Sequence, residues 1–260
     1  MKKYLGIASA ILITSVFVFL YAMKIGPFNN SSTNKSVEPA ASITSEKTDE
    51  IDESDEKISV TAMEALLLGY EEAKKHTDEE PLLIHLTSTD DATVPQERND
   101  GADGKRNTWN LSFGSEKGNF SISMKIDNGK VIPQNVRTDD NNLLSKGQYA
   151  ISDIHIDSPK AVKQAIEELG MRSGDPEIPD DWIKGYHFTI AGYLTDPNSF
   201  EKHWLLRVMG ISPNSPNSEN ESLRMSVFFD VKTGEMLNAT EMTGYDKDGN
   251  SKWRDVEPKH

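Results

Sequence analysis

Apolar and polar positions alternate along several stretches of the chain, and this spacing predicts antiparallel strands. In residues 120–127, Phe120, Ile122, Met124 and Ile126 point to one side, while the polar residues between them point to the other. A sheet that is buried on one face only shows this pattern. Strands are expected at 58–61, 84–87, 109–114 and 120–127, and again at 154–157, 186–189, 204–210 and 223–230.

Helical spacing of apolar residues predicts one amphipathic helix in each half, at 62–75 and 159–170. Asp157 or Ser158 can cap the second helix, Pro159 suits its first turn and Gly170 suits its end. The apolar stripe of each helix would cover the buried face of a sheet. The predicted fold class is therefore α+β, with an N-terminal transmembrane helix and then two β-α-β-β-β units, each with a helix packed on an antiparallel sheet.

The N-terminus has the pattern of a targeting segment. Lys2 and Lys3 precede 20 uncharged residues, 4–23, and Lys24 follows them. About 20 residues at 1.5 Å each cross a bilayer core, so this run is predicted to be a retained transmembrane signal anchor. A cleaved signal peptide, which would release a secreted protein, is the alternative. We expect a single-pass protein of the cell membrane with its N-terminus in the cytoplasm and its C-terminal part outside.

The remaining chain divides by composition. Residues 1–3 would be a cytoplasmic stub, and residues 24–57, rich in Ser, Thr, Asp and Glu without an apolar period, would be a disordered acidic stalk. The two predicted units span 58–137 and 150–245, with 133–149 as their link and 246–260 as a polar tail. Trp109 and Trp204 begin apolar runs and are expected to anchor the cores.

Charge and missing residue types exclude several classes of function. The net charge is −14, from 42 acidic and 28 basic residues, which argues against nucleic acid as a partner. The chain has no cysteine, so disulfides, Cys-ligated zinc and thiol nucleophiles are excluded. No nucleophile elbow or phosphate-binding loop is present, and we expect neither a cofactor nor a catalytic set. The expected partners are the membrane, through residues 4–23, and a protein or peptide of the cell envelope that adds a strand to a sheet edge.

Three histidines are the candidate ligand or interface residues. His85 and His187 occupy equivalent positions on the polar face of their predicted strands, and His203 lies in the second unit. One alternative is that His187, Glu201 and His203 bind a metal ion, since histidine and carboxylate groups are zinc ligands. Another is that the histidines are ordinary residues that a duplication has repeated.

The segment Phe228-Phe229-Asp230-Val231-Lys232-Thr233-Gly234-Glu235-Met236-Leu237 follows a Ser-Pro-x-Ala-Val helix start and a Trp-led strand. This half resembles the PepSY domain of secreted metallopeptidase propeptides and of many exported bacterial proteins; the first half is similar to it more weakly. The resemblance implies a small exported module without catalytic residues, of a kind proposed to restrain peptidases or to bind cell-surface partners. We therefore expect an extracytoplasmic, non-catalytic binding or regulatory protein. The alternative is an exported hydrolase or metal-dependent enzyme that uses His and carboxylate groups of the second unit.

Overall fold

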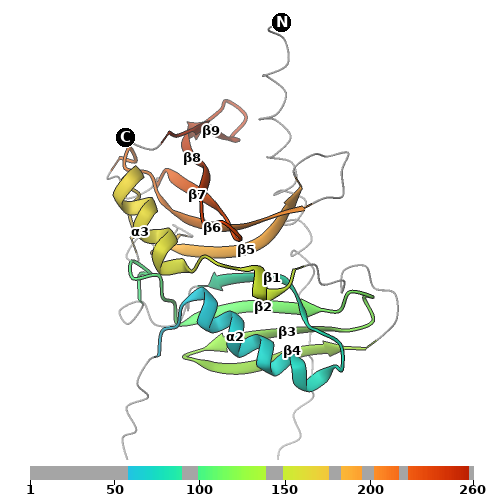
Figure 1. Ribbon diagram of the computed structural model, residues 1–260. Helices are drawn as coiled ribbons and strands as arrows, with labels where there is room; N and C mark the ends of the chain where they lie inside the picture. The colour runs from blue at the N-terminus through green and yellow to red at the C-terminus, as the bar shows by residue number, and fades with distance from the viewer. Residues whose placement is uncertain are drawn as a thin grey trace, which may run out of the picture. The chain divides into compact units, whose positions relative to one another are not determined.

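A computed structural model describes residues 58–89, 99–138, 149–175, 183–194, 202–216 and 222–257. These residues form one nine-stranded antiparallel sheet and two α-helices, and the strands follow the order β4-β3-β2-β1-β5-β6-β7-β8-β9 (Figure 1). The helices are α2 (Ala62–Ala73) and α3 (Ser158–Leu169), and short 3₁₀ turns lie at η1 (Lys74–His76) and η4 (Ile151–Asp153). The strands are β1 (Leu82–Thr89), β2 (Thr108–Gly114), β3 (Ser121–Asp127), β4 (Lys130–Arg137), β5 (His187–Leu194), β6 (Lys202–Ile211), β7 (Arg224–Asp230), β8 (Met236–Tyr245) and β9 (Ser251–Asp255).

The predicted pair of β-α-β-β-β units is wrong, because the fold is mostly β and has a single sheet. Strands β1 and β5, one from each half, pair antiparallel from His85↔Ala191 to Thr87↔Thr189. Two separate sheets would each leave one of these strands as an unpaired edge, and their pairing removes both edges. The strand expected at 58–61 is reduced to an isolated bridge between Val60 and Arg106.

The prediction of a transmembrane signal anchor is also corrected. Within the described ranges, no helix is both long enough and apolar enough to cross a membrane. Residues 4–23, where that anchor was expected, and the stalk at 24–57 lie outside the described residues.

Both helices form where the spacing of apolar residues predicts them, and each begins at a capping residue. Thr61 and Glu64 form a capping box at the start of α2, in which each side chain accepts a hydrogen bond from the backbone N–H of the other residue. Asp157 caps α3, and Gly170 ends it in the left-handed conformation with φ 72°. These signals are local in sequence, which explains why the helix positions could be predicted.

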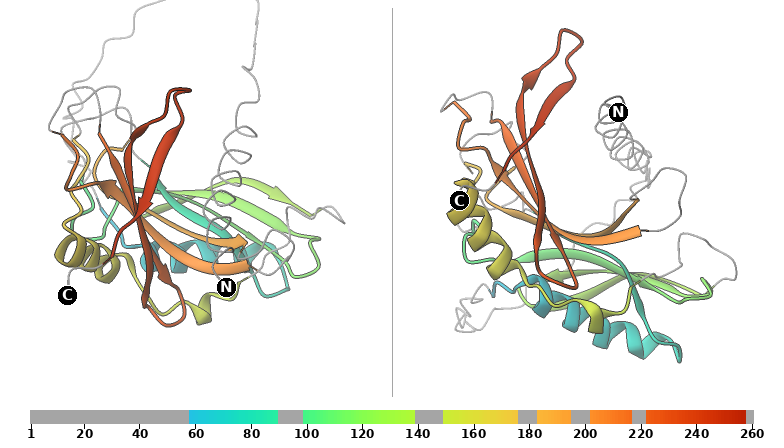
Figure 2. Two further views of the ribbon diagram at one scale, coloured as in Figure 1. Left: turned by 90° about the horizontal axis from the view of Figure 1, so that it is seen from above. Right: turned by 45° about the horizontal axis from the view of Figure 1, so that its top comes forward.

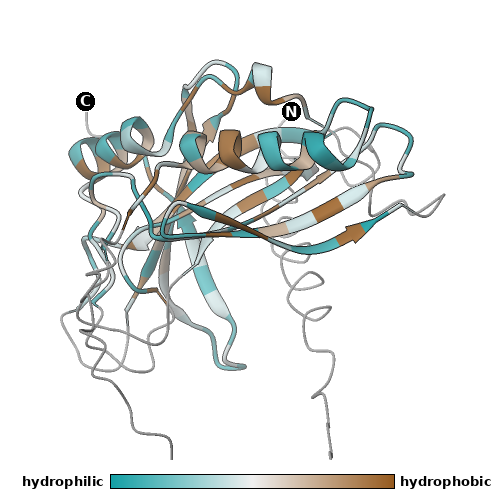
Figure 3. Cartoon of the chain, turned by 90° about the horizontal axis from the view of Figure 1, so that it is seen from below, coloured by the Kyte–Doolittle hydropathy of each residue, from teal (hydrophilic) through white to brown (hydrophobic). Residues whose placement is uncertain are grey.

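One core lies between the sheet and the two helices, which pack on the same face of the sheet (Figure 2). Along β3 buried and half-buried positions alternate, and Figure 3 shows the corresponding change of hydropathy along the strands. Trp109 and Trp204 are 0% and 5% exposed, which confirms them as core residues. The indole N–H of Trp109 donates to the carbonyls of Val60 (3.1 Å) and Arg106 (3.2 Å), so its polar atom is satisfied inside the core.

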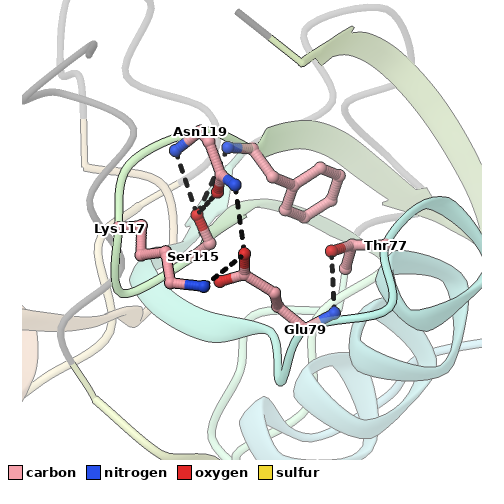
Figure 4. Close-up of polar contacts among 6 residues, drawn as sticks. Thr77, Glu79, Ser115, Lys117 and Asn119 are labelled. Atoms are coloured by element: carbon pink, nitrogen blue, oxygen red, sulfur yellow. Dashed lines mark hydrogen bonds and ion pairs between the residues drawn. The ribbon is translucent and has the colours of Figure 1, made fainter. Parts of the chain in front are cut away.

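A polar cluster fastens the segment after α2 to the hairpin between β2 and β3 (Figure 4). Glu79 Oε1 accepts hydrogen bonds from Asn119 Nδ2 (3.0 Å) and Lys117 Nζ (3.5 Å). Ser115 Oγ in turn accepts from the backbone N–H of Asn119 (3.1 Å). Ser115 is buried and Lys117 is exposed, and because these contacts all involve residues of the hairpin turn, we assign the cluster to holding the hairpin.

Two segments expected to lack structure contain strands. β4 extends into the predicted link at 133–149, and β9 lies in the predicted polar tail at 246–260. β9 pairs with β8, and Arg254 Nε donates to the buried carboxylate of Glu241 at 2.6 Å. Ser212 Oγ and Asn214 Nδ2 donate to the same carboxylate. Glu241 is therefore a structural anchor of the C-terminal strands.

Candidate functional site

The face of the sheet opposite α2 and α3 is here called the helix-free face. Its side chains alternate along each strand with those of the core, so the register of the ladders fixes which of them are neighbours. The register places Thr87 opposite both Asn110 and Thr189, and Thr189 opposite Arg207. These four residues, Asn110, Thr87, Thr189 and Arg207, form a row across β2, β1, β5 and β6, which we call the polar row.

The polar row crosses the boundary between the two halves of the chain. Thr87 Oγ1 and Thr189 Oγ1 are 3.0 Å apart and share a hydrogen bond. Four strands at a spacing of about 4.8 Å give the row a length of roughly 14 Å. All four residues are half-buried. A ligand lying across the strands could therefore contact both halves.

Arg207 is the only charged member of the row, and it lies on β6, next to the central strand β5. Its Nε and Nη2 donate to Ser226 Oγ at 3.1 and 2.7 Å, and Nη2 is 3.4 Å from Met209 Sδ. The guanidinium carbon lies 5.7 Å from the centre of the Phe228 ring, and Phe228 meets Tyr193 edge to face at 5.9 Å. The guanidinium is thus held by the hydroxyl groups of Ser226 and Tyr193 and by the Phe228 ring.

Burial changes the acid–base properties of this group of residues. Burial raises the pKa of the Tyr193 phenol, and the nearby Arg207 opposes that shift. Burial also lowers the pKa of Arg207, and Tyr193 again opposes the shift. Burial is the largest cause of both shifts, and electrostatic interactions are stronger among such half-buried groups than at an open surface.

The structure places the three predicted histidines on the helix-free face but does not cluster them. His85 is on β1, where its Nδ1 lies 2.7 Å from Ser112 Oγ and burial lowers the pKa of the imidazole. His187 begins β5 and is 8% exposed. His203, on β6, binds Asp230 Oδ2 through Nε2 at 2.6 Å. Each histidine therefore has its own environment.

The metal site proposed for His187, Glu201 and His203 does not assemble from the described residues. His187 pairs with Met209, whereas His203 pairs with Tyr193 at the other end of the β5–β6 ladder. That separation is roughly 20 Å. Glu201 lies outside the described residues, and within them no group of three or more metal-ligating side chains occurs.

His203 and Asp230 form a partly buried pair whose carboxylate also serves the backbone. Asp230 Oδ1 accepts hydrogen bonds from the backbone N–H groups of Lys232 (2.8 Å) and Thr233 (2.6 Å) at the turn after β7. Burial acts to raise the pKa of Asp230, but the hydrogen bonds from Thr233, His203 and Lys232 outweigh it and lower that pKa. This arrangement fastens the turn between β7 and β8.

Arg207 was not singled out in the sequence, although one signal for it exists. It is a lone charged residue within the apolar run Trp204-Leu205-Leu206-Arg207-Val208-Met209. Alternation alone assigns such a residue to an open face, where a charge is ordinary. Only the pairing of β5, β6 and β7 shows that Tyr193, Ser226 and Phe228 surround it.

Comparison with known proteins gives little further information. No family model matches the chain, and no curated protein matches it. Among solved structures, it is similar to a candidate lipoprotein from Clostridium difficile 630, with 12% identity, coverage of 73% of this chain and 96% of that chain, and a TM-score of 0.40. A similarity at this level carries no argument about function.

Proposed function

We propose that this chain is an exported, non-catalytic binding protein whose ligand site is the helix-free face around Arg207. The observation that carries the proposal is the polar row, in which Thr87, Thr189 and Arg207 from three adjacent strands present polar groups on one surface. A rigid sheet positions such groups well, because the ladder hydrogen bonds fix the spacing of the strands. The row joins both halves of the chain, so the complete sheet is the binding unit.

Two sequence features support export and a binding role. The uncharged run at 4–23, preceded by Lys2 and Lys3, is typical of segments that direct export. The resemblance of residues 150–245 to the PepSY domain also favours a small exported module that binds or restrains a partner. Membership of that family is part of the proposal.

The sheet edges favour the helix-free face over strand addition. The edge strand β4 contains Pro133, which lacks a backbone N–H, and carries exposed Lys130 and Arg137 at its ends. Proline and basic side chains on an edge hinder pairing with another strand. The opposite edge strand, β9, has only five residues, Ser251–Asp255.

The absence of native cysteine makes a direct test simple. Ala191 lies on the helix-free face between His85 and Leu205, and Lys163 lies on the exposed side of α3. Single-cysteine chains, Ala191→Cys and Lys163→Cys, would carry an environment-sensitive dye and be titrated with fractions of an envelope extract. We expect a saturable change of emission for the dye at position 191 and none at position 163. No change at 191, or equal changes at both positions, would rule out the proposed site.

The His203–Asp230 pair favours a second candidate, an exported hydrolase that uses this pair. Its short contact of 2.6 Å is of the kind that orients a catalytic imidazole. A His203→Gln variant separates the two functions. Loss of a hydrolytic activity with unchanged dye response at position 191 would support the enzyme, whereas unchanged activity would leave the pair its role in the β7–β8 turn.

A further inference from the structure

The surroundings of Arg207 lack the group that ordinarily accompanies a half-buried cation. Within the described part of the chain, its hydrogen bonds go to Ser226 Oγ, Met209 Sδ and the side chain of Tyr193, and no carboxylate lies within ion-pair distance of it. This lack of a counter-ion occurs in a chain with 42 acidic residues, where a carboxylate partner would be easy to supply.

A half-buried cation without a counter-ion destabilises the folded chain, because the protein only partly replaces the lost hydration. Ser226 and Tyr193 each supply a neutral oxygen, and the Phe228 ring supplies a weak attraction for the guanidinium. A bound anion would provide the missing charge and would use the fork of N–H donors that arginine offers to planar oxyanions.

We propose that Arg207 binds the carboxylate of an organic acid whose apolar part lies against Tyr193, Leu205 and Phe228. This inference rests on the proposed function and names the chemistry of its ligand. On its own row Arg207 has neutral neighbours, Thr189 on one side and Phe228 on the other. One guanidinium between neutral groups matches a single negative charge, which favours a carboxylate over a phosphate dianion.

The apolar side chains near Arg207 favour a ligand that also carries an apolar group. Leu205 lies between Ala191 and Asp230 in the register, on the strand that separates Tyr193 from Phe228. The two rings meet edge to face across it at 5.9 Å. An acid with an aromatic or branched aliphatic group could keep its carboxylate at Arg207 and contact these apolar surfaces, while its polar groups reach Thr189 and Thr87.

The probes are benzoate and benzamide, which have nearly the same shape but differ in charge, and the full chain is used. Nuclear magnetic resonance would follow the backbone signals of Thr189, Arg207 and Phe228 and the Nε–H signal of Arg207 during titration. We expect benzoate to shift these signals saturably and benzamide to bind at least about tenfold more weakly. Equal binding of the two probes, or no saturable shift with benzoate, would overturn the proposal.

Substitutions of Arg207 test whether its side chain is responsible for benzoate binding. Arg207→Gln should weaken benzoate binding at least about tenfold, whereas Arg137→Gln, the same charge change on exposed β4, should leave it unchanged. If Arg207→Gln does not fold, Arg207→Lys is used in its place, because it keeps the charge but loses the fork of N–H donors. A clear loss of benzoate affinity is again expected. Unchanged benzoate affinity in the folded Arg207 variant would refute the assignment. If benzoate affinity were unchanged but the dye at position 191 still gave a saturable response, the proposed binding function would stand and only the carboxylate ligand would be rejected.

Discussion

Asp157 Oδ1 accepts a hydrogen bond of 3.0 Å from the backbone N–H of Met63, which lies 94 residues earlier in the chain. The same oxygen accepts from the backbone N–H of Ser158 at 2.7 Å. One carboxylate therefore caps both α2 and α3, whose N-terminal ends meet at this point. Each helix presents unpaired N–H groups and a partial positive charge there, so a shared anion stabilises both.

We predict that Asp157→Ala lowers the free energy of unfolding by about 1–2 kcal/mol, because a helix cap is lost at two helices at once. Asp157→Asn keeps an acceptor oxygen but loses the charge, and we expect a smaller loss. Urea unfolding followed by circular dichroism measures both values. If Asp157→Ala were as stable as the parent chain, the shared cap would contribute nothing.

Gly104 provides a test of the close packing at the same junction. It has φ +80°, and a Cβ there would lie 2.3 Å from the backbone nitrogen of Pro159. Gly249, in the turn before β9, has nearly the same φ of +81°, but a Cβ there would have no atom within 4 Å. The two positions therefore share the backbone conformation and differ in available space.

We predict that Gly249→Ala costs about 1–2 kcal/mol, which is the usual cost of a left-handed conformation for a residue with a Cβ. Gly104→Ala should cost about 1–3 kcal/mol more, because α3 must move away. Differential scanning calorimetry of the two variants gives the comparison. Equal losses would show that the junction tolerates the displacement.

The elements with local signals could be predicted from the sequence, and the single sheet could not. Pro159 and Gly170 mark the ends of α3, and the alternation from Phe120 to Ile126 marks β3, so the corresponding elements form where expected. Pairing of β1 with β5 joins residues about 100 positions apart, and no local pattern specifies it. A register shift between Leu83 and His85 further hides which residues of β1 share a face.

The candidate site could be predicted only in part, for the same reason. Placing His85 and His187 on the polar face needed only alternation within their strands. The polar row needs the register of four strands, because Asn110 and Arg207 become members of one row only through Thr87 and Thr189. Residues that share a row across two intervening strands leave no trace in sequence spacing.

Glu241 makes the stability of the C-terminal strands depend on pH. It is 2% exposed, and although burial acts to raise its pKa, hydrogen bonds from Ser212, Arg254 and Asn214 lower that pKa below the ordinary value of 4.5. A carboxyl group whose pKa is lower in the folded chain than in the unfolded chain stabilises the fold at pH values above its unfolded pKa. The contribution is lost as the pH falls through the folded pKa.

We predict that Glu241→Gln lowers the free energy of unfolding at neutral pH by about 1–3 kcal/mol, because charge-assisted hydrogen bonds are replaced by weaker ones. The difference from the parent chain should shrink as the pH falls below about 4.5. Urea titrations at a series of pH values measure it, and Glu116→Gln, on an exposed turn, is the matched change of charge. A difference that stays constant across this pH range would contradict the prediction.

Ser88 tests whether the two halves fold as one sheet. Its Oγ accepts a hydrogen bond of 3.0 Å from the buried backbone N–H of Phe188, which adds a connection to the few residue pairs between β1 and β5. Ser88→Ala leaves that N–H without its acceptor and should cost about 1–3 kcal/mol. Ser123→Ala, on half-buried β3 away from this connection, should cost less.

Because the core is continuous, both halves should unfold in a single transition and shift together. Pulsed hydrogen exchange across a urea series can follow peptides from 108–127 and 202–230 separately. Different midpoints for the two peptides, or a shift of only one of them in Ser88→Ala, would show that the halves are independent folding units.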